Sequence, residues 1–111
     1  NNMSYMFYEA KYFNQPLNSW NVSNVKNMNN MFKYTENYNK PLDNWNTSNV
    51  NSMNSMFAYA TDFNQSLNDW NISKVWDIAY MFSNAIKFNK PLNNWDTSNI
   101  QYLQGTFDKA Y

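Results

Sequence analysis

The sequence predicts an α/β repeat solenoid, with one short strand and one short helix in each 25-residue coil and a parallel ladder of strands. Two observations lead to this prediction. A tryptophan recurs every 25 residues, and a Met-Phe pair recurs at the same interval. A repeat this short cannot bury its own apolar face, so neighbouring repeats are expected to stack. We therefore expect residues 1–111 to form a single solenoid segment of four 25-residue repeats plus a partial repeat, within a longer chain.

The first expected element is a helix of about 10–12 residues in each repeat, close to the mean helix length. Its signal is an apolar stripe with spacings of three, one, three and three residues, which is typical of one helix face. In the first repeat the stripe consists of Met3, Met6, Phe7, Ala10 and Phe13. A serine before each stripe suits the helix N-cap, where a hydroxyl oxygen accepts a backbone N–H. These serines are Ser23, Ser48, Ser73 and Ser98.

A connector and a strand are expected to complete each repeat. Residues 38–42 (Tyr-Asn-Lys-Pro-Leu) represent the connector, because proline fixes φ and favours extended geometry in the residue before it. Residues 45–47 (Trp-Asn-Thr) represent the strand, since they alternate strand-forming and polar side chains. Such short strands are stable when copies lie side by side about 4.8 Å apart.

Stacking would place like side chains over one another in columns. A buried tryptophan would then contribute up to roughly 4–6 kcal/mol to stability. The predicted columns are Trp20, Trp45, Trp70 and Trp95; Phe7, Phe32, Phe57, Phe82 and Phe107; Leu17, Leu42, Leu67 and Leu92; and Asn14, Asn39, Asn64 and Asn89. We expect the asparagine amides to bond the backbone of their own turn or of the next coil. The alternatives are a ligand-facing array of amides and, at other asparagines such as Asn21, glycan attachment.

Composition narrows the range of functions. The formal net charge is zero, which gives no electrostatic basis for binding nucleic acid or an anionic membrane surface. The chain has no Cys and no His, and it lacks the sequence signatures of phosphate-binding loops, zinc proteases and serine hydrolases. No apolar run approaches the roughly 20 residues of a membrane span. We expect a protein that is not an enzyme, has no cofactor or metal and does not insert into a membrane.

Aromatic residues that depart from the repeat are the candidate contact surface. Trp76 and Tyr80 are four residues apart in an expected helix, so they would share a face, with Tyr102 beside them. Tyr34 and Tyr59 form a second column, as a stacked pair or a platform for a sugar. Exposed aromatic clusters mark interaction sites. The alternative for Trp76 is packing against a neighbouring coil or a flanking domain.

The repeat F-N-x-P-L-x-x-W-N-x-S-N-V-x-x-M-x-x-M-F-x-x-A resembles that of the DUF285 family, which includes BspA-like surface proteins and mycoplasma lipoprotein-associated repeats. The resemblance covers essentially the whole chain and implies a leucine-rich-repeat-like solenoid without catalytic residues. Departures from the pattern are Ser66, Lys74, Trp76 and Thr106. Gly105 and Thr106 together indicate that the regular array weakens toward residue 111.

The resemblance also implies a setting. We expect an extracellular or cell-surface location of bacterial or mollicute type; the alternative is the virion or the host cell of a large virus. The expected function is a repeat scaffold for adhesion or protein–protein binding, with an unidentified protein partner. One alternative is a structural building block of a viral or cell-surface fibre, in which copies or neighbouring repeats contact one another. The other is a carbohydrate-binding array of Tyr and Asn side chains.

Overall fold

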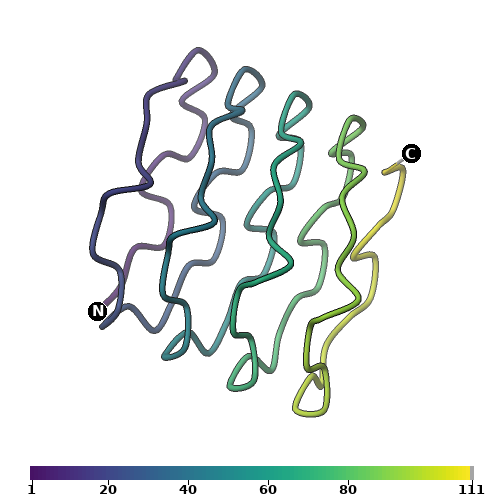
Figure 1. The fold of residues 1–111 in the computed structure, drawn as a ribbon. Coiled ribbons are helices and arrows are strands. Elements are labelled where there is room, and N and C mark those ends of the chain that lie inside the picture. Colours follow the sequence, from purple (N-terminus) through teal and green to yellow (C-terminus); the bar gives the residue numbers. More distant parts are fainter. Residues whose placement is uncertain (111) are drawn as a thin grey trace.

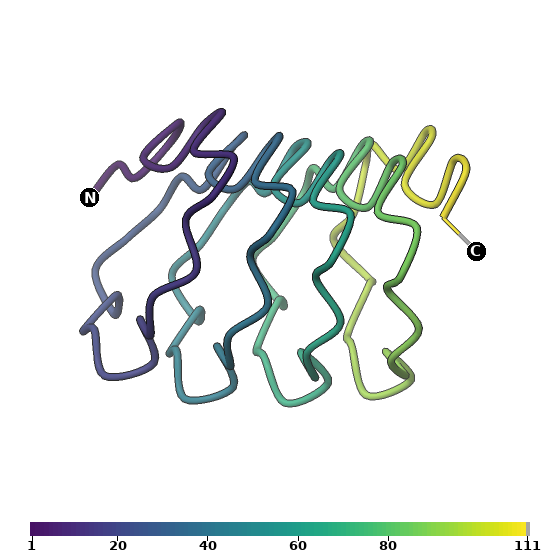
Figure 2. The ribbon, with the colours of Figure 1, turned by 90° about the horizontal axis from the view of Figure 1, so that it is seen from above.

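The computed structural model describes residues 1–110, in which successive 25-residue segments lie side by side (Figure 1). We call these segments coil 1 (residues 1–25), coil 2 (26–50), coil 3 (51–75) and coil 4 (76–100), and residues 101–110 begin coil 5. The two ends of the described segment, residues 1–110, lie at opposite ends of this row of coils (Figure 2). The part of the predicted repeat array at residue 111 lies outside the described residues.

The predicted fold class is wrong. Residues 1–110 contain no helix, and they contain no strand longer than a single bridge residue. The parallel bridges join the second residues of successive coils, which are Asn2, Asn27, Ser52, Asp77 and Tyr102. The segments predicted as strands, such as residues 45–47, carry no bridge, and the serines predicted as N-caps begin no helix. The molecule is therefore not a leucine-rich-repeat-like α/β solenoid built from helices and a strand ladder.

The segment predicted as a helix folds as two consecutive β-turns, which we call the turn pair. In coil 3 the Met56 N–H donates to the Met53 carbonyl at 3.2 Å, and residues 57–60 form the second turn in the same way. The third residues of these turns, Ser55 and Tyr59, have φ of 57° and 60°. This is the left-handed conformation that a type II turn requires at its third position.

Hydrogen bonds to the next coil explain why a helix does not form. Met53 donates its N–H to the Asp77 carbonyl, and Ser55 donates to the Ala79 carbonyl, both at 2.9 Å. Phe57 and Tyr59 continue the pattern, so every second N–H of the turn pair bonds a carbonyl 24 residues later. A helix would use the same groups internally, four residues apart. Pairing with the next coil satisfies them while bringing the coils into contact.

Stacked side chains form the core between the coils. The rings of Phe32 and Phe57 stack with centroids 5.4 Å apart, and Phe82 follows at 5.7 Å. Trp45 and Trp70 are each 3% exposed and stack at 6.3 Å. The leucine column and the column of Tyr38 also contribute to the core, and their buried members are Leu17, Leu42, Leu67, Tyr38, Phe63 and Phe88.

The outer coils bury these columns less completely. Trp20 is 41% exposed and Phe107 is 53% exposed, whereas their equivalents in the middle of the row are buried. Phe7, Leu92 and Trp95 are partly buried and pack against the core. The loss of burial follows from having a neighbouring coil on one side only.

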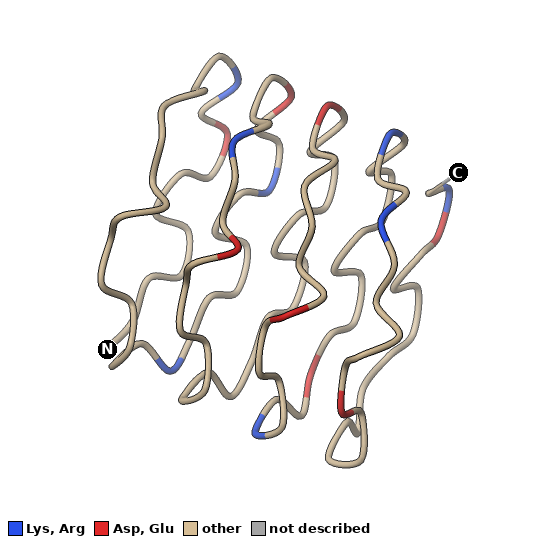
Figure 3. Ribbon diagram, viewed as in Figure 1, with Lys and Arg blue, Asp and Glu red and all other residues tan. Residues whose placement is uncertain are grey.

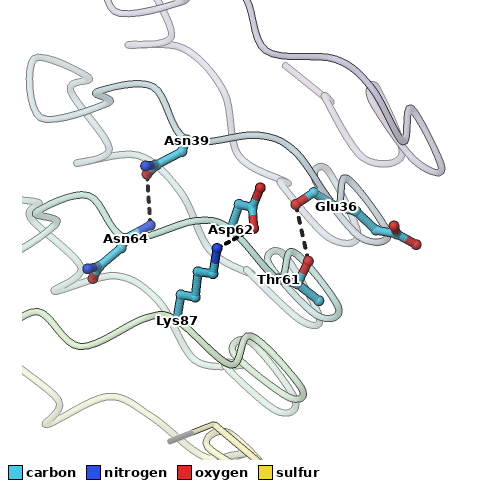
Figure 4. Close-up of polar contacts among 6 residues, drawn as sticks. All are labelled: Glu36, Asn39, Thr61, Asp62, Asn64 and Lys87. Carbon is cyan, nitrogen blue, oxygen red and sulfur yellow. Dashed lines mark hydrogen bonds and ion pairs between the residues drawn. The ribbon is translucent and has the colours of Figure 1, made fainter.

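Polar groups also link the coils in register. The indole N–H of Trp45 donates to the Leu17 carbonyl of the preceding coil at 2.9 Å. The side-chain oxygen of Asn39 accepts the backbone N–H of Asn64 at 2.9 Å (Figure 4). Asn14 accepts from Asn39, and Asn64 from Asn89, in the same way. These amides bond the backbone of the next coil.

Each of coils 1 to 4 also contains a short turn in which an asparagine or aspartate side chain bonds the serine two residues later. The side-chain oxygen of Asn46 accepts both the N–H and the hydroxyl of Ser48, at 3.0 and 2.6 Å. Asp96 accepts the same two bonds from Ser98, and these lower the pKa of the Asp96 carboxyl. The serines predicted as helix N-caps therefore belong to turns that begin at an asparagine or aspartate.

Candidate binding surface

Five tyrosines lie along the turn pairs of coils 1 to 4, and we call them the tyrosine strip: Tyr5, Tyr8, Tyr34, Tyr59 and Tyr80. Tyr8 meets the ring of Tyr34 edge-on with centroids 5.7 Å apart, and Tyr34 stacks on Tyr59 at 4.8 Å. Tyr34 is partly buried, whereas the other four are exposed. The strip therefore presents aromatic rings to solvent across several coils.

The backbone at four of these five tyrosines is unusual. Tyr5, Tyr34, Tyr59 and Tyr80 have φ between 58° and 66°. The left-handed conformation costs a residue with a Cβ roughly 1–2 kcal/mol, and a bulky residue there is an outlier. Other coils fill the equivalent positions with smaller or polar residues, which include Asn30, Ser55, Asn84 and Gly105. The turns can therefore form without tyrosine.

An open depression, which we call depression A, lies at one end of the strip. Its volume is about 290 Å³, and it is lined by Tyr8, Glu9, Lys11, Tyr34 and Glu36. Lys11 and Glu36 form an exposed ion pair at 3.7 Å. Desolvation, and then the negative charge of Glu9, raise the pKa of the Tyr8 phenol. Aromatic rings and charges of both signs thus meet at one place.

Depression B lies further along the strip and has a volume of about 300 Å³. Its aromatic walls are Tyr59 and Tyr80. The ring of Tyr80 lies against Gly105, where an added Cβ would come within 2.5 Å of the ring. The polar residues that line depression B are Lys33, Ser55, Ser83, Asn84, Asp108 and Lys109.

The structure brings together only some of the predicted contact residues. Trp76 and Tyr102 are 40% and 48% exposed and meet edge-on, with ring centroids 5.7 Å apart. Tyr80 belongs to the tyrosine strip, and Trp76 and Tyr80 share no helix face because the segment is not helical. Tyr34 and Tyr59 stack directly. The predicted set therefore divides between the strip and a separate Trp76–Tyr102 pair.

Two members of the strip, Tyr5 and Tyr8, are absent from the predicted contact surface. A signal was present, because Tyr5 and Tyr80 occupy the same place in their repeats. Their repeat position lies four residues before the repeat position that Tyr34 and Tyr59 occupy. Only the turn pair, which has left-handed residues at both of these repeat positions, shows that they are equivalent places in two successive turns.

The side chains of the strip are suited to holding a ligand. Aromatic faces, hydroxyls, amides and charges of both signs supply apolar contact and hydrogen bonds. Charged residues of both signs are spread over the coils (Figure 3). Within residues 1–110 no three His, Cys, Asp or Glu side chains gather as metal ligands would. The same residues include no helix of the length and apolarity needed to cross a membrane.

Comparison with known proteins identifies the family. The family model described as "Mycoplasma protein of unknown function, DUF285" matches residues 1–111, and the chain belongs to this family. Neither the curated proteins nor the solved structures gave a match.

Proposed function

We propose that this member of the DUF285 family is a non-enzymatic binding scaffold, displayed outside a cell, and that the tyrosine strip is its surface for adhesion to a partner. The observation that carries the proposal is the occurrence of exposed tyrosines at left-handed positions. Strain that folding does not require tends to persist where it serves function. Asn30 and Asn84 supply the same turns in other coils, so the tyrosines are explained better by contact with a partner.

The geometry favours binding for a second reason. Tyrosine offers a large apolar ring and a hydroxyl on a side chain with few rotatable bonds, and it is enriched in binding hot spots. Each turn pair is tied to the next coil by backbone hydrogen bonds, such as Tyr34 to Ala58 at 3.0 Å and Tyr59 to Ser83 at 2.8 Å. The backbone that carries the rings is thus held in place, which lowers the entropy lost on binding.

Adhesion of protein-coated beads to cultured cells tests the proposal. The double variant Tyr59→Asn/Tyr80→Asn removes two rings and installs a residue that the repeat already uses at left-handed positions. We expect bead adhesion to fall to the level of uncoated beads, because aromatic anchors supply most of the binding energy. Tyr102→Asn, an exposed tyrosine outside the strip, is the matched control and should adhere like the natural chain. Equal adhesion by the double variant and the control would refute the role of the strip.

A second candidate function, a building block of a fibre, is favoured by the two ends of the row. Within residues 1–110, alternate N–H groups of coil 5 donate to no backbone carbonyl, namely those of Leu103, Gly105, Phe107 and Lys109. In coil 1, the carbonyls that would match them accept no backbone N–H, namely those of Asn2, Ser4, Met6 and Tyr8. The two ends are complementary, so another copy could continue the pattern, as could a further coil of the same chain.

Sedimentation of the 111-residue chain over a wide concentration range tests this second function. A building block should form end-to-end oligomers as concentration rises. Phe107→Lys should weaken them, since it places a charge on an exposed aromatic surface at the end of the row. A monomer at every concentration would show that coils 1 and 5 of this segment do not pair end to end.

A further inference from the structure

We infer that the tyrosine strip binds an uncharged oligosaccharide chain, with sugar rings held in depressions A and B. The inference rests on the proposed function, for which it names the chemical class of the ligand. The inference starts from aromatic rings that border small open depressions, with hydrogen-bonding side chains around them.

The aromatic walls suit a sugar ring. One face of many pyranose rings presents C–H groups, which pack on the negative face of an aromatic ring. Each depression has two tyrosine walls: Tyr8 and Tyr34 in depression A, and Tyr59 and Tyr80 in depression B. The volumes of depressions A and B, about 290 and 300 Å³, are close to the lower limit of the range for ligand sites, which is roughly 300–1,000 Å³. Each therefore has room for a small ring rather than for a large side-chain cluster.

Hydrogen-bonding groups beside the rings suit hydroxyls. In depression B, the Asn84 amide donates to the Ser83 hydroxyl at 3.1 Å, and its side-chain oxygen can accept a further bond. Asp108 lines the same depression, and Glu9 and Glu36 line depression A. Sugar hydroxyls donate and accept, so they can pair with carboxylates and amides together.

The charges favour an uncharged ligand. Depression A combines Lys11 with two glutamates, and depression B combines two lysines with Asp108. A strongly anionic or cationic chain would meet like charges in both places, which disfavours binding. The net charge of zero leaves no overall field to attract such a chain from a distance.

The spacing favours a chain over a single sugar. Depression A lies between coils 1 and 2, whereas both tyrosine walls of depression B lie in coils 3 and 4. They are about two coil spacings apart, roughly 10 Å if coils repeat like neighbouring strands. Tyr34, a wall of depression A, stacks on Tyr59, a wall of depression B, with ring centroids 4.8 Å apart, so this pair links the two depressions. An oligosaccharide that passes over this pair would engage both depressions, and the linkage would strengthen two weak contacts.

Calorimetric titration with defined oligosaccharides tests the inference. The probes are cello-, chito-, malto- and manno-hexaoses, with a heparin hexasaccharide as the anionic contrast. We expect at least one neutral hexaose to bind, and Tyr59→Asn/Tyr80→Asn to weaken it by about tenfold or more, the effect of losing roughly 1.4 kcal/mol. Tyr59→Phe keeps the ring and should retain most of the affinity. The Tyr102→Asn control should bind like the natural chain.

The outcomes distinguish failure of the oligosaccharide inference from failure of the proposed function on which it rests. Binding of no neutral hexaose, or equal binding by the double variant and the control, overturns the oligosaccharide inference. If the strip variants nevertheless lose cell adhesion, the binding scaffold stands and its partner belongs to another class than neutral oligosaccharides. If the strip variants change neither adhesion nor sugar binding, both proposals fail. Stronger binding of the heparin hexasaccharide than of every neutral one also overturns the inference, because it contradicts the assignment of an uncharged ligand.

Discussion

Tyr38 is the residue at which the core departs most clearly from its own pattern. Its column otherwise consists of Phe13, Phe63 and Phe88. The Tyr38 side chain is fully buried, and its hydroxyl has no hydrogen-bond partner among the described residues. A buried hydroxyl without a partner costs about 1–3 kcal/mol. The ring supports stacking, whereas the hydroxyl opposes folding.

Removing this hydroxyl should therefore stabilise the protein. We predict that Tyr38→Phe raises the free energy of unfolding by about 1–2 kcal/mol, because it keeps the ring and relieves the unpaired oxygen. Urea unfolding of the two chains measures the difference. Phe63→Tyr is the mirror-image control and should be destabilising. A loss of stability in Tyr38→Phe would show that the hydroxyl has a partner.

Alkaline pH gives a second prediction at this residue. Burial raises the pKa of the Tyr38 phenol above its ordinary value of 10.0. Above pH 10 the unfolded phenol ionises while the folded one keeps its proton, so the folded state binds more protons and stability falls as pH rises. Below about pH 9 the effect is absent, because the phenol is protonated in both states. The melting temperature of Tyr38→Phe should exceed that of the natural chain by a margin that widens from about pH 9 to about pH 11, whereas a constant margin would contradict the shift.

At the scale of elements, the sequence predicts which residues of the turn pair are buried, but it does not predict the conformation of their backbone. The apolar spacing selects Met53, Met56 and Phe57, and all three side chains are fully buried. The same spacing places side chains on one face of a helix or on one side of two successive four-residue turns. The choice depends on N–H groups that bond the next coil, which no pattern within one repeat reveals. Asn30 and Gly105 at the left-handed position were the local signal for turns.

A glycine substitution distinguishes these two backbones by the sign of its effect. We predict that Ser55→Gly stabilises the protein by about 0.5–1 kcal/mol, because Ser55 has φ of 57° and glycine adopts that conformation without strain. In a helix the same change would cost about 1 kcal/mol. Ala58→Gly in the same turn pair, outside the left-handed positions, is the control and should destabilise. Thermal unfolding of both variants supplies the comparison, and destabilisation by Ser55→Gly would contradict the turn pair.

The candidate site was only partly predictable for the same reason. The sequence places Tyr34 and Tyr59 one repeat apart, which is sufficient to predict their contact. The expected grouping of Trp76 with Tyr80 relied on helical spacing, and the turn pair places Tyr80 beside depression B. Depressions A and B depend on how neighbouring turn pairs stack. No single-repeat pattern contains that information.

At the scale of the whole molecule, the absence of helices from residues 1–110 has a direct spectroscopic consequence. We predict a far-ultraviolet circular dichroism spectrum without the double minimum of α-helices, together with a cooperative thermal transition. A helix in every coil would give a strong helical signal instead. Such a signal, lost in the same transition, would contradict the turn-pair architecture.

The stability of the row should depend on position, because each coil contacts only its neighbours. Phe57 in coil 3 is fully buried and packs against Phe32, Phe63 and Phe82, with ring centroids 4.2–5.7 Å apart. Phe107, at the same place in coil 5, is 53% exposed and stacks on Phe82. Identical side chains thus occupy equivalent positions with very different burial.

We therefore predict that Phe57→Ala lowers the free energy of unfolding by about 3–5 kcal/mol, as for other large core truncations. Phe107→Ala should cost less than about 1 kcal/mol, since half of its ring is already in water. Denaturant unfolding of the two variants measures both values under identical conditions. Equal losses would mean that coil 5 supports the fold as strongly as coil 3. A small loss at Phe57 would mean that the aromatic columns do not hold the coils together.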